Sequence, residues 1–81
     1  MGHKVYEAII RAITEGRLIE PFTQLDFQRS CPGLGDGTYK AFLYKHSKGN
    51  PGGYTELFKR VGPGQFHCLR PFKYGFMEAF K

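Results

Sequence analysis

The sequence contains little cysteine and no long apolar run. Its two cysteines, Cys31 and Cys68, are too few for a disulfide scaffold. No segment resembles a signal peptide or approaches the roughly 20 apolar residues that span a bilayer. We therefore expect an intracellular protein, of the cytoplasm or nucleoid, with no membrane partner. Met1-Gly2-His3 is either a native start or a cloning remnant, and we draw nothing from it.

The sequence also lacks the groupings of residues that mark cofactor sites and catalysis. Cys31, His46, His67 and Cys68 are the candidate soft metal ligands, but they show neither Cys-x-x-Cys nor His-x(3–5)-His spacing. The acidic residues are scattered, so no carboxylate pair indicates hydrolysis. The glycine-rich run 33–37 has no strand before it, and a Gly-Lys-Ser/Thr element is absent, which disfavours nucleotide binding. We expect no metal, no cofactor and no enzyme activity.

Positive charge is concentrated in the second half of the chain. Residues 1–39 hold four basic and five acidic side chains, a net charge of −1, whereas residues 40–81 hold eight basic and two acidic ones, a net charge of +6. Such asymmetry favours one basic face and an anionic partner. The same charge also serves solubility, and on its own it does not separate the two roles.

Length and periodicity predict a single domain, residues 1–81, that begins with two helices. Eight Phe and five Tyr in 81 residues supply large apolar side chains for a small core. Residues 17–22 are expected to form a short strand, since Pro21 disfavours helix at the residue before it. Thr23-Gln-Leu-Asp26 resembles a capping box and starts a second helix that ends at residues 31–33. The first helix is predicted before Gly16 by apolar residues at three- and four-residue spacing: Val5, Ala8, Ile9, Ala12 and Ile13.

The third predicted helix, residues 38–47, has an apolar side and a basic side. Asp36 or Thr38 can cap it. At 100° per residue, Tyr39, Phe42, Leu43 and His46 fall together, and we expect them in the core. The rest of the surface is polar, basic and locally small: Thr38, Lys40, Ala41, Tyr44, Lys45, Ser47 and Lys48.

After the third helix the pattern changes to that of strands. Residues 57–61 and 65–69 are expected to pair as a hairpin around Gly62-Pro63-Gly64, because Pro followed by Gly suits the centre of a type II turn. Residues 71–81 form an aromatic extension with Phe72, Tyr74, Phe76 and Phe80. The order is helix, short strand, helix, helix, strand, wing, strand. It predicts an α+β fold, the winged helix-turn-helix with three helices and a C-terminal β-hairpin wing.

Three features between residues 6 and 69 also carry a family resemblance. They are the apolar first helix, the basic third helix ending at Lys45-His46, and the run Leu-Phe-Lys-Arg-Val-Gly-Pro-Gly-Gln-Phe over residues 57–66. This run is similar to the wing signature F-x-R-V-x-x-G-x-F/Y of winged helix-turn-helix modules of the HARE-HTH type. Such modules occur alone or fused to chromatin and restriction-modification proteins. The resemblance implies DNA binding.

For a winged helix, the expected partner is double-stranded DNA. The third helix would lie in the major groove, and the wing would meet neighbouring phosphates. Lysines outnumber arginines on the helix, which favours backbone contacts over bidentate base reading. The candidate contacts on the helix are Thr38, Lys40, Ala41, Tyr44, Lys45 and Lys48. Those on the wing are Lys59, Arg60, Gly62, Pro63, Gly64 and Gln65.

Two other classes of partner fit the same pattern. A winged helix can dock a protein through exposed aromatic residues such as Tyr44, Tyr74 or Phe76. An RNA-binding module would stack exposed rings on bases, but most rings here fall at core spacing. The sequence does not indicate the target site or the oligomeric state.

Overall fold

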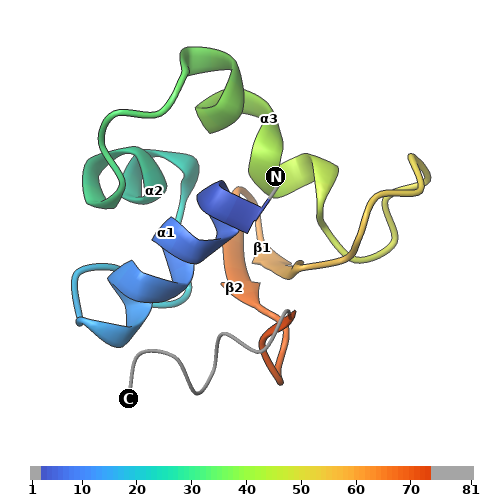
Figure 1. Ribbon diagram of the computed structural model, residues 1–81. Helices are drawn as coiled ribbons and strands as arrows, with labels where there is room; N and C mark the ends of the chain where they lie inside the picture. The colour runs from blue at the N-terminus through green and yellow to red at the C-terminus, as the bar shows by residue number, and fades with distance from the viewer. Residues whose placement is uncertain (1–2, 74–81) are drawn as a thin grey trace.

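Three helices precede a two-stranded hairpin in the computed structural model, which describes residues 3–73. The helices are α1 (His3–Thr14), α2 (Gln24–Ser30) and α3 (Asp36–Lys45), and the strands are β1 (Phe58–Gly62) and β2 (Gln65–Cys68). Figure 1 shows the helices gathered together with the hairpin against one side of them. The fold is α+β, and this arrangement is compatible with a winged helix. None of these helices has the length and apolar character needed to cross a bilayer.

The strand expected at residues 17–22 does not form, so the predicted count and order of strands are wrong. The backbone amides of Arg17 and Leu18 donate to the carbonyl of Ala12 and close the end of α1. Only Phe22 pairs with the hairpin, exchanging two 2.8 Å hydrogen bonds with Phe66. Pro21 has no amide hydrogen to extend this ladder. Within the described residues the sheet has two strands and two added bridges, the second being a parallel bridge between Ser47 and Phe58.

The predicted boundaries of the first two helices are confirmed. Gly16, just after α1, has a φ of 80°, a backbone conformation that glycine adopts without steric cost. At α2 the Thr23 hydroxyl accepts from the amide of Asp26 at 3.1 Å, and the Asp26 carboxylate accepts from the amide of Thr23 at 3.0 Å. This reciprocal capping box satisfies amides that have no partner within the helix.

Helix α3 begins and ends two residues earlier than the sequence predicts. Gly35, not Asp36 or Thr38, is the N-cap, and its carbonyl accepts from Thr38 and Tyr39. Asp36 instead lies in the first turn, where a carboxylate interacts favourably with the helix dipole. Ser47 is buried, contrary to its predicted place on the polar side, because its hydroxyl donates to the Leu43 carbonyl at 2.6 Å.

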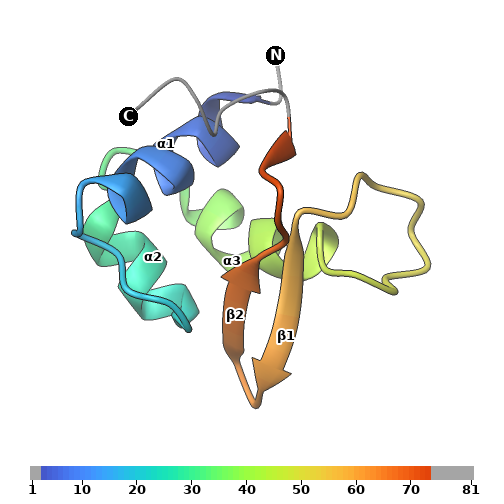
Figure 2. The same ribbon diagram turned by 90° about the horizontal axis from the view of Figure 1, so that it is seen from below.

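The hairpin forms around the expected turn, with the first strand one residue later than predicted and the second ending one residue earlier. Gly64 has a φ of 67°, which the second central position of a type II turn requires. Phe58 pairs with Cys68 and Arg60 with Phe66, and an irregularity follows between Arg60 and Gly62. Figure 2 shows the turn projecting from the body in a different direction from the loop that follows α3.

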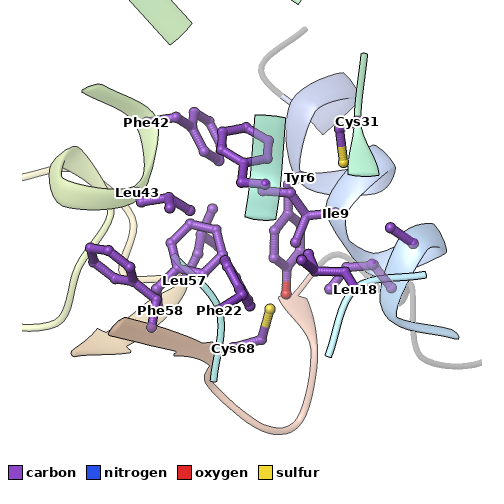
Figure 3. Close-up of a cluster of buried hydrophobic side chains, with 14 of the residues drawn as sticks. Tyr6, Ile9, Leu18, Phe22, Cys31, Phe42, Leu43, Leu57, Phe58 and Cys68 are labelled. Atoms are coloured by element: carbon purple, nitrogen blue, oxygen red, sulfur yellow. The ribbon is translucent and has the colours of Figure 1, made fainter. Parts of the chain in front are cut away.

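Aromatic rings from separate elements meet in the core (Figure 3). The ring of Phe58 makes edge contacts with those of Tyr6, Phe22 and Phe42 at centroid distances of 6.2, 6.3 and 5.9 Å. Tyr39, Phe42 and Leu43 are buried, as the helical periodicity predicts. His46, expected with them, is only half-buried. One core thus joins α1, the segment before α2, α3 and β1.

Residues beyond β2 return to α1 and to the segment before α2. Phe72 packs against the core, and the Lys73 amide donates to the Tyr6 hydroxyl at 3.0 Å. The remainder of the aromatic extension, with Tyr74, Phe76 and Phe80, lies outside the described residues, as do Met1 and Gly2.

Glu20 connects its segment to the end of β2. Its carboxylate accepts from the Cys68 amide at 2.7 Å and pairs with the Arg70 guanidinium at 2.6 Å. Burial alone would raise the pKa of Glu20, but hydrogen bonds from Arg70 and from the Cys68 amide outweigh it and lower the pKa below 4.5. The charged form of Glu20 therefore stabilises the fold.

Glu20→Gln should lower the free energy of unfolding by about 1–2 kcal/mol at neutral pH, because a charge-assisted pair is lost. A lowered folded-state pKa means that this contribution is complete above the ordinary value of 4.5 and disappears as pH falls through the folded value. Urea denaturation should show a constant gap between wild type and variant above about pH 5, closing in more acidic solution. The control is Glu15→Gln, whose exposed pair with Arg17 contributes at most about 1 kcal/mol. A gap that does not change with pH would contradict this assignment.

Candidate nucleic-acid interface

The exposed side of α3 carries most of the predicted contact residues. Because Tyr39, Phe42 and Leu43 turn into the core, Lys40, Ala41, Tyr44 and Lys45 are left facing solvent. Thr38 is half-buried, and Lys48 lies exposed just beyond the end of the helix. Small residues keep the first half of this side shallow, and Ala41 and Thr38 line a hollow of about 430 Å³ with Lys45.

Positive charge on this side increases toward the end of α3. Lys40 pairs with Asp36 one turn earlier at 3.5 Å, and both side chains are largely exposed, at 71% and 80%. Such a pair contributes little stability, but it places a carboxylate beside the first lysine. Lys45 and Lys48 have no carboxylate partner among the described residues. The lysines without a paired carboxylate therefore lie at the end of α3 and just beyond it, and not at its start.

Loop 48–57 is held against the end of α3 by His46. The His46 ring lies 4.6 Å from that of Phe42 and 5.7 Å from that of Tyr54, measured between centroids. Its Nδ1 atom is 2.7 Å from the Thr55 carbonyl oxygen, so this nitrogen carries the hydrogen. The Lys45 ammonium lies 4.7 Å above the Tyr54 ring. These contacts fix where the loop leaves the helix.

Tyr44 joins α3 to the hairpin. Its ring meets the edge of the buried Phe66 ring at a centroid distance of 5.0 Å, and the Arg60 guanidinium lies over it at 5.5 Å. The sequence left open whether this side chain covers the loop at residues 49–53. Its ring contacts are instead with the hairpin, while its carbonyl accepts from the Asn50 side chain at 2.9 Å.

The structure brings only some of the predicted wing residues near α3. Phe58 faces the core, so Arg60, two residues along the strand, projects from the same face toward Tyr44. Lys59 lies between Phe58 and Arg60 along the strand and pairs with His67 of β2. Because side chains alternate along a strand, Lys59 projects from the other face of the hairpin. Residues 62–65 form the turn and the start of β2 (Figure 2). Lys59 and Arg60, both predicted as wing contacts, thus lie on opposite faces of the hairpin, and only Arg60 faces α3.

A hollow of about 230 Å³ lies where α3, its following loop and β1 meet. Lys48 and Arg60 line it, together with Tyr44, Ser47 and the loop residues 49–51. Sequence analysis did not single out Ser47, Gly49, Asn50 or Pro51 as contact residues. Ser47 was predicted on the polar side of the helix, and the signal of residues 49–51 was turn composition, which indicates a loop but not what it lies against.

The two cysteines belong to the hydrophobic core. Both thiols are buried and free. Burial raises the pKa of Cys31, and burial together with nearby Glu20 raises that of Cys68 to about 12. Residues 3–73 contain no group of three or more His, Cys, Asp or Glu side chains that could hold a metal ion.

No protein-family model, curated protein or solved structure matches the chain. The resemblance to HARE-HTH modules therefore stays a prediction, and the geometry alone carries the functional argument.

Tyr44→Ala should lower the free energy of unfolding by about 1–2 kcal/mol, because it removes an aromatic pair and exposes part of Phe66. Tyr44→Phe keeps the ring and should stay within about 0.5 kcal/mol of wild type. Chemical denaturation measures both, and amide exchange should quicken in β1 and β2 of the Ala variant alone. Equal stabilities for the two variants would mean that the ring does not brace the hairpin.

Proposed function

We propose that the chain is a non-catalytic winged helix-turn-helix module that binds double-stranded DNA. The observation that carries the proposal is a set of basic side chains at the end of α3 without a carboxylate partner among the described residues. Lys45 is exposed on the last turn of the helix, and Lys48 and Arg60 line one hollow beside it. Isolated basic side chains on one surface attract a polyanion and release its counterions on binding.

The arrangement of the elements supports the winged-helix assignment. A short helix, a tight connector and a second helix precede a hairpin, and Phe22 bridges to β2 where a third strand would pair. The Tyr39 hydroxyl holds the connector by donating to the Cys31 carbonyl and accepting from the Leu34 amide at 3.0 Å. The exposed side of α3 is then free to meet a groove.

The proposed contacts make different contributions to DNA binding along α3 and the hairpin. The shallow first half of α3, with Thr38 and Ala41, would let the helix approach the duplex closely, while Lys40 is partly neutralised by Asp36. Lys45 and Lys48 would contact phosphates as point charges, and Arg60 would reach the backbone from the hairpin. This pattern favours binding with modest sequence preference and strong dependence on salt.

A different face favours the second candidate, docking of a protein. Ile19 and Val61 are 70% and 44% exposed. Val61 also lines a mainly apolar hollow with Glu20, Pro21 and His67, on the face of the hairpin away from Arg60. Exposed apolar surface of this kind occurs at protein interfaces. This candidate takes precedence if the duplex does not bind.

Reversing the charges of Lys45 and Lys48 together should weaken binding of a random-sequence duplex at least about tenfold at low salt, because two phosphate contacts become repulsive. Fluorescence anisotropy at two salt concentrations measures the affinity. Amide shifts on titration should fall on residues 38–48 and 59–65.

The matched control reverses Arg29 and Lys73, which are exposed and lie outside α3 and the hairpin. It changes net charge equally and should weaken binding only slightly. Equal losses in the two double variants would show that net charge alone drives association, and the assigned face would be wrong.

A further inference from the structure

The hollow between α3, loop 48–57 and β1 is lined by two cationic side chains, and the nearest carboxylate in the loop, that of Glu56, is bound to the amide of the lining residue Gly49. Lys48 enters from the loop side and Arg60 from the hairpin side. Neither has a carboxylate partner within the described residues. Two like charges facing one small space repel each other. An anion bound between them is attracted by both, and these attractions offset the repulsion.

The walls of the hollow are fixed by bonds that do not use the two charges. The Lys48 amide donates to the Phe58 carbonyl at 2.7 Å, and the Asn50 side chain donates to the Tyr44 carbonyl at 2.9 Å. Arg60 lies over the Tyr44 ring, which itself rests on Phe66. Helix, loop and strand thus hold their positions before any ligand arrives, which reduces the cost of ordering them on binding.

The available donors determine the class of ligand. The amides of Lys48 and Asn50 are already paired, with the carbonyls of Phe58 and Ser47, and the Gly49 amide donates to the Glu56 carboxylate at 3.0 Å. A ligand must therefore be held by the side chains. The guanidinium offers a planar fork for two oxygens of one anion, and the ammonium offers a point charge for a third. A phosphate group has several charged oxygens on one centre and suits this pair.

We propose that this hollow is a phosphate-binding site in which Lys48 and Arg60 hold one and the same phosphate group. The assignment of that phosphate to DNA rests on the proposed function. In DNA the group is either an internal phosphodiester of a duplex or a terminal 5′-phosphate. In either case the site fixes the position of the sugar-phosphate backbone relative to α3 and the hairpin.

The first probe is inorganic phosphate. Its binding is monitored by NMR at constant ionic strength, with chloride as the reference anion. Saturable amide shifts should appear at residues 47–51 and 60 with phosphate and not with chloride. Arg60→Gln should abolish them, whereas Lys59→Gln, the same charge change on the other face of the hairpin, should not. Shifts spread over all the lysines, or equal shifts with chloride, would overturn the proposal.

A double-substitution series on the duplex tests whether the two cations share a phosphate. Each phosphate contact contributes about 0.9 to the slope of log affinity against log salt, or about 3.5-fold between 50 and 200 mM. Lys48→Gln with Arg60→Gln should therefore lower the slope by about 0.9 in total. Lys45→Gln with Lys48→Gln removes separate contacts and should lower it by about 1.8. A loss of about 1.8 for Lys48 with Arg60 would mean two phosphates and overturn the shared site.

Further arms of the experiment identify the source of the phosphate and separate the two proposals. A gain in affinity from a 5′-phosphate over a 5′-hydroxyl, lost in Arg60→Gln, would identify a terminal phosphate. Equal affinities for the duplexes with a 5′-phosphate and a 5′-hydroxyl, together with the salt slopes predicted above, would identify an internal phosphodiester. If inorganic phosphate binds at the hollow and the duplex does not, the phosphate site stands and the proposed DNA function fails. The circular dichroism spectrum of each variant is compared with that of Arg60→Lys, which keeps the charge at this position. Matching spectra verify that the fold is kept.

Discussion

The ring of Phe58, at the start of β1, contacts Tyr6 of α1, Phe22 of the segment before α2, and Phe42 of α3. A domain this small has little apolar area to bury, so a few large rings in edge contact provide much of its core. The backbone reinforces this position, since the amides of Leu57 and Phe58 both donate to the His46 carbonyl at the end of α3. The start of β1 is thereby fixed to the end of the third helix.

That constraint determines which cations can act together. Side chains alternate along a strand, so placing Phe58 in the core sends Arg60 toward α3 and Lys59 to the opposite face. Tyr44 fills the space between helix and hairpin and supports the guanidinium. The hollow with Lys48 is therefore a consequence of how the hairpin packs, and core and proposed phosphate site are parts of one arrangement.

The sequence predicts those features that depend on near neighbours. Capping at Thr23, the apolar side of α3 and the Pro63-Gly64 turn follow from spacing and backbone preference, and the structure confirms them. Features that depend on distant residues were missed. The strand at residues 17–22 does not form because the amides of Arg17 and Leu18 bond to the Ala12 carbonyl. On the β2 edge that faces this segment, the amide beyond Phe66, that of Cys68, donates to the Glu20 side chain instead of to a backbone carbonyl. Likewise, neither the burial of Ser47 nor the approach of residues 49–51 to Arg60 has a local signature.

Charge and shape together favour recognition of the backbone over reading of bases. Within the proposed interface the lysines are point charges on flexible stems, and the arginine is occupied over Tyr44 at the edge of the helix rather than at its centre. The centre of the exposed side instead presents Thr38 and Ala41, which can accept close contact but offer few donors to base edges. The carboxylate of Asp36 makes the first turn of α3 the least favourable part for phosphate, so an approaching duplex would be drawn toward the junction with the hairpin. Under the proposed function, a protein built in this way would position a duplex by its phosphates, and sequence preference would come from the shape of the DNA.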